Sequence, residues 1–238
     1  MTQFSSSGSS RLVLAPAVVA SPATLAGVKP ATVLRREEIL TVARDLFFLR
    51  GFDAASMRDI ARGINLTQAA IYYHFKSKEE ILFALIDAFT VLLHDRLQQA
   101  LLETDEPIEG LRRAVRVHIL LTRTHFREIK LVVEDKKLLG SAYAERVKES
   151  ELRIYALYRS RVGELMAAGV CRPLEPSVVV FNILAVINFI FQWYRPDGTL
   201  ELEEIAKQTV ELLFSGLLAD APSVAIKRGS KASRQSKS

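Results

Sequence analysis

The chain has 238 residues and a net charge of +5, which allows one or two domains with a sizeable core. Its hydrophobic content of 49% is ordinary for a soluble globular protein. The single cysteine, Cys171, excludes an internal disulfide, and its isolation fits a reducing, cytoplasmic compartment.

Basic charge is concentrated in one part of the sequence. Residues 31–78 contain eight Lys/Arg and five Asp/Glu, whereas residues 79–220 contain seventeen and twenty-two. The last eighteen residues contain five basic and no acidic residues. This asymmetry suits a DNA-facing head on a body that repels DNA.

Residues 1–30 are rich in Ser, Ala, Pro and Val and carry little charge, so we expect a disordered leader. The run RLVLAPAVVASPA also has features of a signal peptide. Its apolar part is short and Pro16 interrupts it, which favours a flexible leader. Residues 219–238 form a basic, Ser-rich segment that we also expect to be disordered.

Helical signals begin after the leader. A helix is predicted from about Thr32 to Arg50, with a buried face that includes Ile39 and Phe47 and a stop at Gly51. A second, short helix follows Ser56, a good N-cap with Asp59 three residues later.

A tight turn and another short helix follow. Asn65 tolerates the left-handed backbone that ends the first helix, and Thr67 caps the next one, Gln68 to about Phe75. This is helix-turn-helix spacing, in which the second helix enters the major groove of DNA. A compact helical corner with exposed aromatic residues is the simpler alternative.

The second helix has an unusual outer surface. Gln can pair with adenine edges, a small Ala can contact a thymine methyl group, and Tyr hydroxyls can donate to phosphates. Lys78 begins the following helix, where its ammonium and the backbone N–H groups can meet one phosphate. The outward positions of the second helix are Thr67, Gln68, Ala69, Tyr72, Tyr73 and His74.

The segment IYYHFKSKEEIL, preceded by SMRDIARGI, resembles the TetR (TetR/AcrR) family of bacterial transcriptional repressors. The resemblance covers residues 33–85 in detail and the remainder in outline. One departure is Asn65, where the family usually has Gly. By position, the resemblance implies that Arg58, Gln68 and Ala69 read bases, and that Ser56, Thr67, Tyr72, Tyr73, His74 and Lys78 mostly hold phosphates.

Four long helices are predicted next. The first begins at Ser77, forms a capping box with Glu80, and runs to about Leu102. In the resembling family, ligand binding shifts this helix and spreads the two DNA-binding heads. The other three predicted helices are Pro107 to His125, Arg127 to Leu139 and Ala142 to Ala168.

The last two predicted helices are the candidates for dimerisation. Residues 176–194 are strongly apolar but slightly short for a membrane span and contain two Asn and one Gln, so we expect a helix buried on nearly all sides. Thr199 is expected to cap the final helix, whose apolar face includes Leu212. Two such helices suit a four-helix dimer interface, which the family usually forms; burial within the monomer is the alternative.

The sequence shows no enzyme signature and no metal-spaced cluster of His and Cys residues, so we expect no enzymatic activity, no cofactor and no metal site. A mostly apolar pocket with a few polar groups would suit a hydrophobic effector, although core or dimer contacts are the simpler roles. The candidate pocket residues are His118, Thr122, Tyr155, Asn188, Gln192 and Trp193. The run QWYRPDG, followed by LEEIA, is similar to a branch that regulates lipid and sterol catabolism, some of whose members respond to acyl-CoA thioesters.

These patterns predict an all-α protein of about nine helices. We expect a leader at 1–30, a three-helix DNA-binding head at 31–78, an effector-binding and dimerisation domain at 79–218, and a tail at 219–238. The predicted function is a homodimeric, non-membrane repressor that binds a palindromic DNA operator and is released by a small molecule. The alternatives are a DNA-bound architectural or protein-recruiting factor without an effector, and a helical enzyme or lipid-binding protein.

Overall fold

The computed structural model describes residues 30–218, and this part of the chain is all-α, with eight α-helices and no strands. Residues 1–29 of the predicted leader and the predicted tail, 219–238, lie outside the described residues. The helices are α1 Pro30–Arg50, α2 Met57–Gly63, α3 Gln68–His74, α4 Lys78–Leu102, α5 Pro107–Lys130, α6 Ser141–Ala167, α7 Pro176–Trp193 and α8 Leu202–Leu217.

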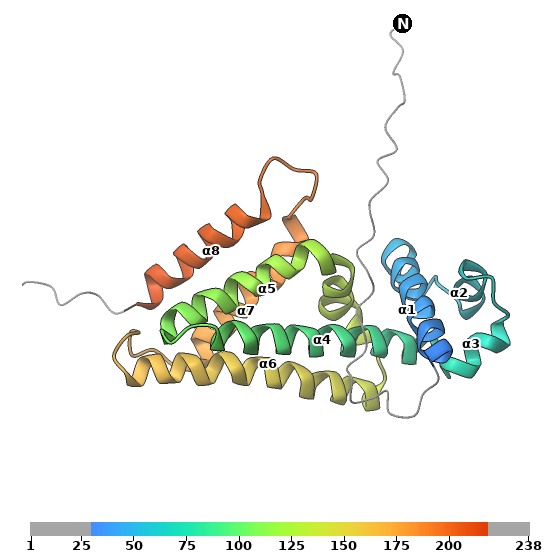
Figure 1. The fold of residues 1–238 in the computed structure, drawn as a ribbon, viewed down its shortest axis with the longest axis horizontal. Helices are drawn as coiled ribbons and strands as arrows, with labels where there is room; N and C mark the ends of the chain where they lie inside the picture. The colour runs from blue at the N-terminus through green and yellow to red at the C-terminus, as the bar shows by residue number, and fades with distance from the viewer. Residues whose placement is uncertain (1–29, 219–238) are drawn as a thin grey trace, which may run out of the picture.

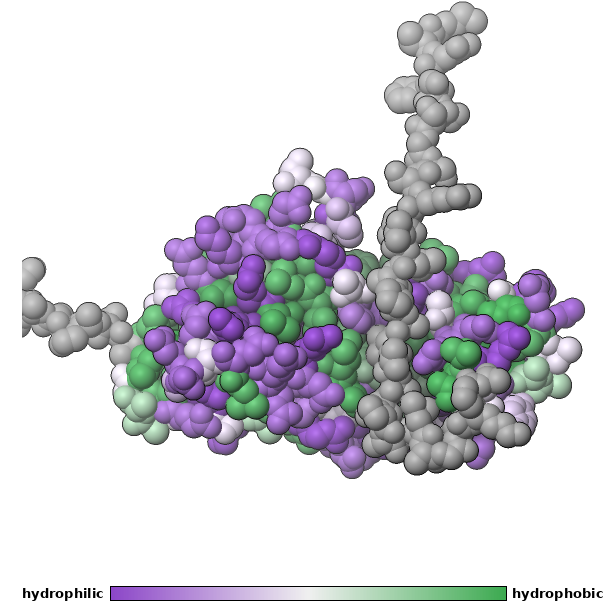
Figure 2. All heavy atoms as spheres, viewed as in Figure 1, coloured by the Kyte–Doolittle hydropathy of each residue, from purple (hydrophilic) through white to green (hydrophobic). Residues whose placement is uncertain are grey.

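The helices form a small head and a larger body (Figure 1). The head consists of α1, α2, α3 and the first turns of α4, and the body contains the rest of α4 with α5 to α8. Helix α4 has 25 residues, so at 1.5 Å per residue it spans about 38 Å and joins the two parts. Both α7 and α8 pack against α5. On the face drawn in Figure 2, hydrophilic residues cover most of the body.

The head is organised around a filled apolar core. Ile39 and Phe47 of α1, Ile60 of α2 and Ile71 of α3 are fully buried there. Phe75, directly after α3, is equally buried, and the core continues into α4 at Ile81, Leu82 and Ile86. The start of α4 therefore belongs to the head, because it contributes to the head's core.

The caps predicted for the head and α4 are present. The Asn65 backbone is left-handed with φ of 55°, as its place in the turn predicts. The Ser77 side chain accepts a hydrogen bond from the Glu80 N–H, at 3.0 Å. The Glu80 carboxylate, however, accepts from the Lys76 N–H at 2.7 Å, so the reciprocal half of the predicted capping box is displaced by one residue.

The region after His125 differs from the prediction. We expected separate helices ending at His125 and beginning at Arg127, whereas α5 continues through a kink at His125, where φ is −124° and ψ is 30°. A π-helical turn, Leu131–Asp135, and a 3₁₀ turn, Lys136–Leu138, then replace the end of the predicted helix. This merger explains why the described chain has eight α-helices.

The prediction for α7 was wrong in one respect. The helix is not buried on nearly all sides, because Phe181 and Phe189 are 62% and 63% exposed. By length and composition α7 is the one helix of residues 30–218 that could cross a membrane, and most of it is not buried within the chain. The exposed apolar residues lie three to five positions apart and form one face: Val178, Phe181, Val186, Phe189 and Trp193.

The last helix also begins later than predicted. Its N-cap is Glu201 and not Thr199, because the first turn starts at Leu202. Leu202 and Leu217 are buried against the body as expected, whereas Leu212 is 75% exposed and does not belong to the buried face. Most of the apolar face of α8 is therefore used within the chain itself.

A buried ion pair joins head and body. Arg44 of α1 donates to Glu128 of α5 over 3.0 Å, and both side chains are buried. Burial alone would lower the pKa of Arg44, but Glu128 and Asp45 raise it above its ordinary value, so the guanidinium remains charged. Arg127 pairs with Asp45 beside it, at 2.8 Å.

Candidate nucleic-acid interface and effector cavity

The helix-turn-helix is held by its own caps. The Ser56 hydroxyl oxygen accepts from the Asp59 N–H at 3.1 Å, and the Asp59 carboxylate accepts from the Ser56 N–H at 3.2 Å. The Ser56 hydroxyl also donates to this carboxylate, and these bonds lower the pKa of Asp59. Ser56, expected at a phosphate, thus has a structural role in capping α2, while Arg58 two residues further is exposed.

Helix α3 presents a polar and aromatic outer face. Thr67 caps it by accepting from the Ala70 N–H at 3.2 Å, and Ile71 anchors it in the core. Gln68 and Ala69 of its first turn are exposed. The side chains of Tyr72 and Tyr73 are exposed by 48% and 80%, unusually high values for aromatic residues. All the candidates on α3 except His74 are therefore accessible to a large partner.

His74 is half-buried at the end of α3. Arg36 of α1 donates to its carbonyl oxygen at 2.9 Å, and the Arg36 guanidinium lies over the Phe75 ring. Burial, followed by the charges of Arg36 and Arg35, lowers the pKa of His74. The imidazole is therefore uncharged at neutral pH and can contribute a hydrogen bond, but no positive charge, toward a phosphate.

Lys78 lies differently from the expectation. Its ammonium donates to three backbone carbonyls, those of Phe52 at 2.6 Å, Ala55 at 2.9 Å and Asp53 at 3.2 Å. It also lies over the Phe52 ring. The side chain thus holds the loop between α1 and α2 against the start of α4. It does not point into solvent, and its role is to position the helix-turn-helix.

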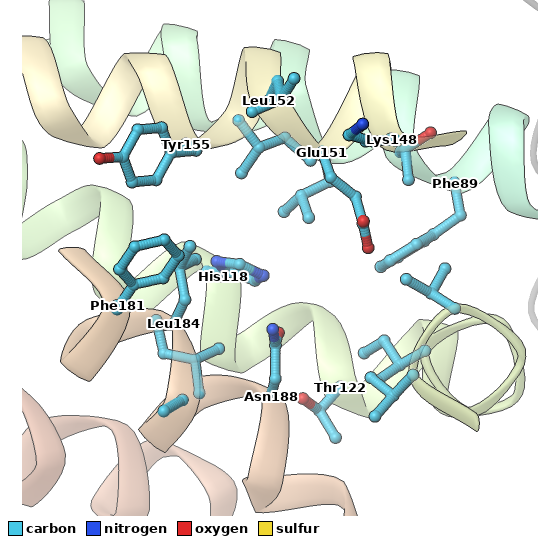
Figure 3. A pocket seen from close by; sticks show the side chains of 18 residues that line it. Phe89, His118, Thr122, Lys148, Glu151, Leu152, Tyr155, Phe181, Leu184 and Asn188 are labelled. Carbon is cyan, nitrogen blue, oxygen red and sulfur yellow. The ribbon is translucent and has the colours of Figure 1, made fainter. Parts of the chain in front are cut away.

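The body contains a cavity of about 450 Å³ between α4, α5, α6 and α7 (Figure 3). Four of the six predicted effector-binding residues line it: His118, Thr122, Tyr155 and Asn188. The other two do not. Gln192 donates to Glu134 at 2.9 Å, and Trp193 is exposed at the end of α7, because both lie one turn beyond the cavity.

His118 is a buried polar residue of this wall. Its Nδ1 lies 3.2 Å from the Tyr158 hydroxyl, and both side chains are within the body core. Burial lowers the pKa of His118 to about 4 and raises the pKa of Tyr158. Both groups are consequently uncharged at neutral pH.

The sequence interpretation missed the acidic part of the wall. Glu151 of α6 directs its carboxylate into the cavity, and Phe89 of α4 lies opposite (Figure 3). Glu151 also accepts from Lys136 of the 3₁₀ turn. The available signal was the helical spacing that places Glu151 one turn before Tyr155. Tyr155 contributes its ring, while its hydroxyl donates to Ser177 at 2.9 Å.

Two family profiles match the two parts of this architecture. Residues 39–85 match "Bacterial regulatory proteins, tetR family", and residues 104–217 match "Tetracyclin repressor-like, C-terminal domain". The transcriptional regulator UidR of Escherichia coli K12 is 30% identical over 178 residues, which cover 73% of this chain and 85% of UidR. The chain belongs to the TetR family. It is accordingly a transcriptional regulator and not an enzyme.

Other TetR-family proteins are similar over most of their length. The transcriptional repressor KstR2 of Mycobacterium tuberculosis H37Rv is 24% identical over 77% of this chain and 92% of KstR2. The structure of this ketosteroid regulator superposes with a TM-score of 0.71. AibR, solved with isovaleryl coenzyme A and operator DNA, has a TM-score of 0.71 and 29% identity over 76% of this chain and 98% of AibR.

The remaining titratable side chains do not form a metal site within the described part of the chain. No group of three or more His, Cys, Asp or Glu residues among positions 30–218 is arranged to hold a metal ion. Cys171 is buried beside Leu218, and its burial raises the pKa of the thiol.

Proposed function

We propose that this TetR-family regulator is a repressor that binds a palindromic operator as a homodimer and is released by a hydrophobic small molecule. The observation that carries the proposal is the apolar cavity of about 450 Å³, because a volume of this size with few polar groups suits a small-molecule effector. The cavity favours this function over an architectural or protein-recruiting factor with a filled core.

The exposed face of α3 supports DNA binding. We assign base reading to Arg58, Gln68 and Ala69, all exposed, and phosphate contacts to Thr67, Tyr72 and Tyr73. Two such helices in a dimer would enter successive major grooves about 34 Å apart. Lys78 and Ser56 would act by holding the recognition helix, through the backbone and capping bonds that they form.

The exposed face of α7 supports dimerisation. Phe189 and Trp193 are exposed apolar residues on one face of α7, and Leu212 on α8 adds another. Phe181 is exposed on the same face of α7 and also lines the cavity. Soluble proteins rarely leave such surfaces uncovered, and a second copy of the chain would bury them symmetrically. The proposed interface uses α7 more than α8, because α8 already packs its apolar face on α5.

The nature of the effector is suggested by two similar proteins. AibR was solved with an acyl-coenzyme A, and KstR2 is described as a ketosteroid regulator. Acyl thioesters and ketosteroids are both largely apolar, as the cavity is. We therefore propose that the effector belongs to lipid catabolism and that an acyl thioester is one candidate. The regulator would act in the cytoplasm, where DNA and thioesters are both present.

One short segment after the kink in α5 contributes both to the cavity wall and to the head's core. Ile129, Val132 and Val133 line the cavity, whereas Leu131 between them is fully buried in the head's core. A ligand that displaces this wall would therefore disturb the head. To switch binding from mostly on to mostly off, the effector must prefer the released conformation by about 5 kcal/mol.

DNA binding is tested by selecting bound fragments of genomic DNA at near-physiological salt. We expect a palindromic site whose affinity falls at least tenfold in Tyr72→Ala. Leu102→Ala provides a matched control, because Leu102 is also exposed but lies at the C-terminal end of α4, away from the head. Weak binding that shows no sequence preference and vanishes as salt rises would overturn the repressor proposal.

Dimerisation is tested by sedimentation of Phe189→Asp. A charge in the middle of the α7 face should convert the dimer to a monomer, whereas Leu102→Asp should leave the dimer intact, since both side chains are exposed in the single chain. A Phe189→Asp protein that remains dimeric would place the interface elsewhere.

A further inference from the structure

We propose that the cavity selects a ligand whose enclosed part is uncharged and apolar and carries a carbonyl or hydroxyl oxygen, which accepts a hydrogen bond from His118. The inference rests on the proposed effector function and specifies the chemistry that the cavity recognises. It distinguishes esters, thioesters, ketones and alcohols from free carboxylic acids of the same length.

The Tyr158 hydroxyl determines which ring nitrogen of His118 carries the proton. Tyr158 is fully buried, and within residues 30–218 its hydroxyl meets one partner, His118 Nδ1 at 3.2 Å. A buried hydroxyl hydrogen needs an acceptor, so the hydroxyl donates to Nδ1. The neutral imidazole then carries its own hydrogen on Nε2.

This Nε2–H group opens on the cavity. Among the described residues no buried side-chain nitrogen or oxygen lacks a hydrogen-bond partner, yet Nε2 bonds to none of them. It therefore retains access to the cavity that His118 lines. The hydroxyl of Thr122, one turn further on α5, also has no partner in the described chain and lines the same wall (Figure 3).

The donor set at this wall suits a neutral oxygen. His118 supplies one N–H, Thr122 a hydroxyl and Asn188 an amide, and none of these groups carries charge. An enclosed carboxylate needs a cation or several donors to replace its hydration, and the two ammonium groups near this wall, those of Lys148 and Lys136, already have carboxylate partners. A carbonyl oxygen, by contrast, is satisfied by one or two such donors.

Glu151 strengthens this selection. Its carboxylate points into the cavity and pairs with Lys136, so this ion pair offers no free cation to a second carboxylate (Figure 3). Lys148 also lines the cavity, but its ammonium lies 3.4 Å from Glu145 on the outer side of α6. A cationic ligand would have to displace Lys136, which already pairs with Glu151.

The test uses three eight-carbon probes: octan-2-one, octanoate and octane. Each displaces N-phenyl-1-naphthylamine, a neutral apolar dye, from the full-length protein at pH 7.5. We expect octan-2-one to bind at least tenfold more tightly than octanoate. Because octane lacks a polar group, its affinity reports the apolar contribution alone.

Two variants attribute the preference to named groups. His118→Leu should weaken octan-2-one about tenfold and leave octane unchanged or tighter, because one hydrogen bond is lost while apolar contact remains. His94→Leu, at a histidine outside this cavity, should change neither. Glu151→Gln should tighten octanoate about tenfold, whereas Glu149→Gln, the same change at an exposed residue of α6 outside the cavity, should not.

The outcomes separate this inference from the proposed function. If octanoate binds as tightly as octan-2-one, or if His118→Leu weakens octane as much as the ketone, the assigned chemistry is wrong while the cavity remains an effector site. If neither octan-2-one nor octane displaces the dye, the cavity does not take apolar ligands, and both proposals fall.

Discussion

Head and body place their polar residues in opposite ways. In the head, Gln68, Tyr72 and Tyr73 stand outside a filled core, and the residues beneath them, such as Ile71, are fully buried. In the body, His118 and Thr122 turn inward around a cavity. Exposed residues can change with little effect on folding, whereas buried polar residues contribute to stability and recognition together.

Removing the ion pair between the two regions should have the largest effect. Glu128→Ala leaves the Arg44 guanidinium buried without its partner, so we expect the free energy of unfolding to fall by about 3–5 kcal/mol. Urea denaturation measures this loss. The control is Glu38→Ala, which removes an exposed pair with Arg35 and should cost less than about 1 kcal/mol.

The double variant Arg44→Met, Glu128→Leu shows whether the buried charge is responsible. Replacing both partners by apolar residues should recover much of the stability lost in Glu128→Ala. Equal losses in the single and double variants would indicate that the joint depends on the shape of this contact and not on its charges.

The next largest effect should be a loss of body stability in acid. Burial lowers the pKa of His118 from 6.5 to about 4, so below pH 6.5 the unfolded chain binds a proton that the folded chain does not. Stability is therefore complete above pH 6.5 and declines as pH falls toward 4. Between pH 6.5 and 5 we expect the native protein to lose about 2 kcal/mol more than His118→Leu.

Urea midpoints of the two proteins at several pH values measure this difference. Groups that titrate in both proteins, including His125, cancel in the comparison. Parallel pH profiles for the two proteins would show that His118 accepts a proton in the folded state, and that the wall of the cavity becomes charged in acid.

Local rules explain why the sequence predicted the head well. The caps at Ser56, Thr67 and Ser77 each involve a backbone N–H three residues away, and Asn65 supplies a left-handed residue at the turn. These interactions span a single turn of helix. They can therefore be recognised from the residue type and its spacing alone.

The body depends on contacts that residue spacing does not determine. His118 and Asn188 were assigned to the cavity, but Glu151 was not, because its orientation depends on how α6 packs against α4 and α7. The merger of two predicted helices at His125 has the same origin. Even in the head, the contacts of Lys78 escaped prediction, since its acceptors lie 23 to 26 positions earlier.

A smaller loss of stability is expected when Lys78, a charged residue with a structural role in the head, is replaced. Lys78→Met removes three bonds to backbone carbonyls, so we expect a loss of about 2 kcal/mol in the free energy of unfolding. Lys76→Met is the matched control, because the Lys76 side chain is exposed and should contribute less than about 0.5 kcal/mol. If the two variants are equally stable, Lys78 has no structural role, and only the expected contact with the DNA backbone remains.

The smallest effect on stability should come from Gln68→Ala, because Gln68 is exposed on the first turn of α3. We expect less than about 0.5 kcal/mol in unfolding, but a loss of about 1–2 kcal/mol of preference at one or two operator base pairs. Selection from randomised operators measures that preference. A uniform loss of affinity across operator sequences would mean that Gln68 contacts phosphate. A loss of preference at particular base pairs, without destabilisation, would show that recognition and folding depend on different residues in the head. In the cavity, by contrast, His118 contributes to both.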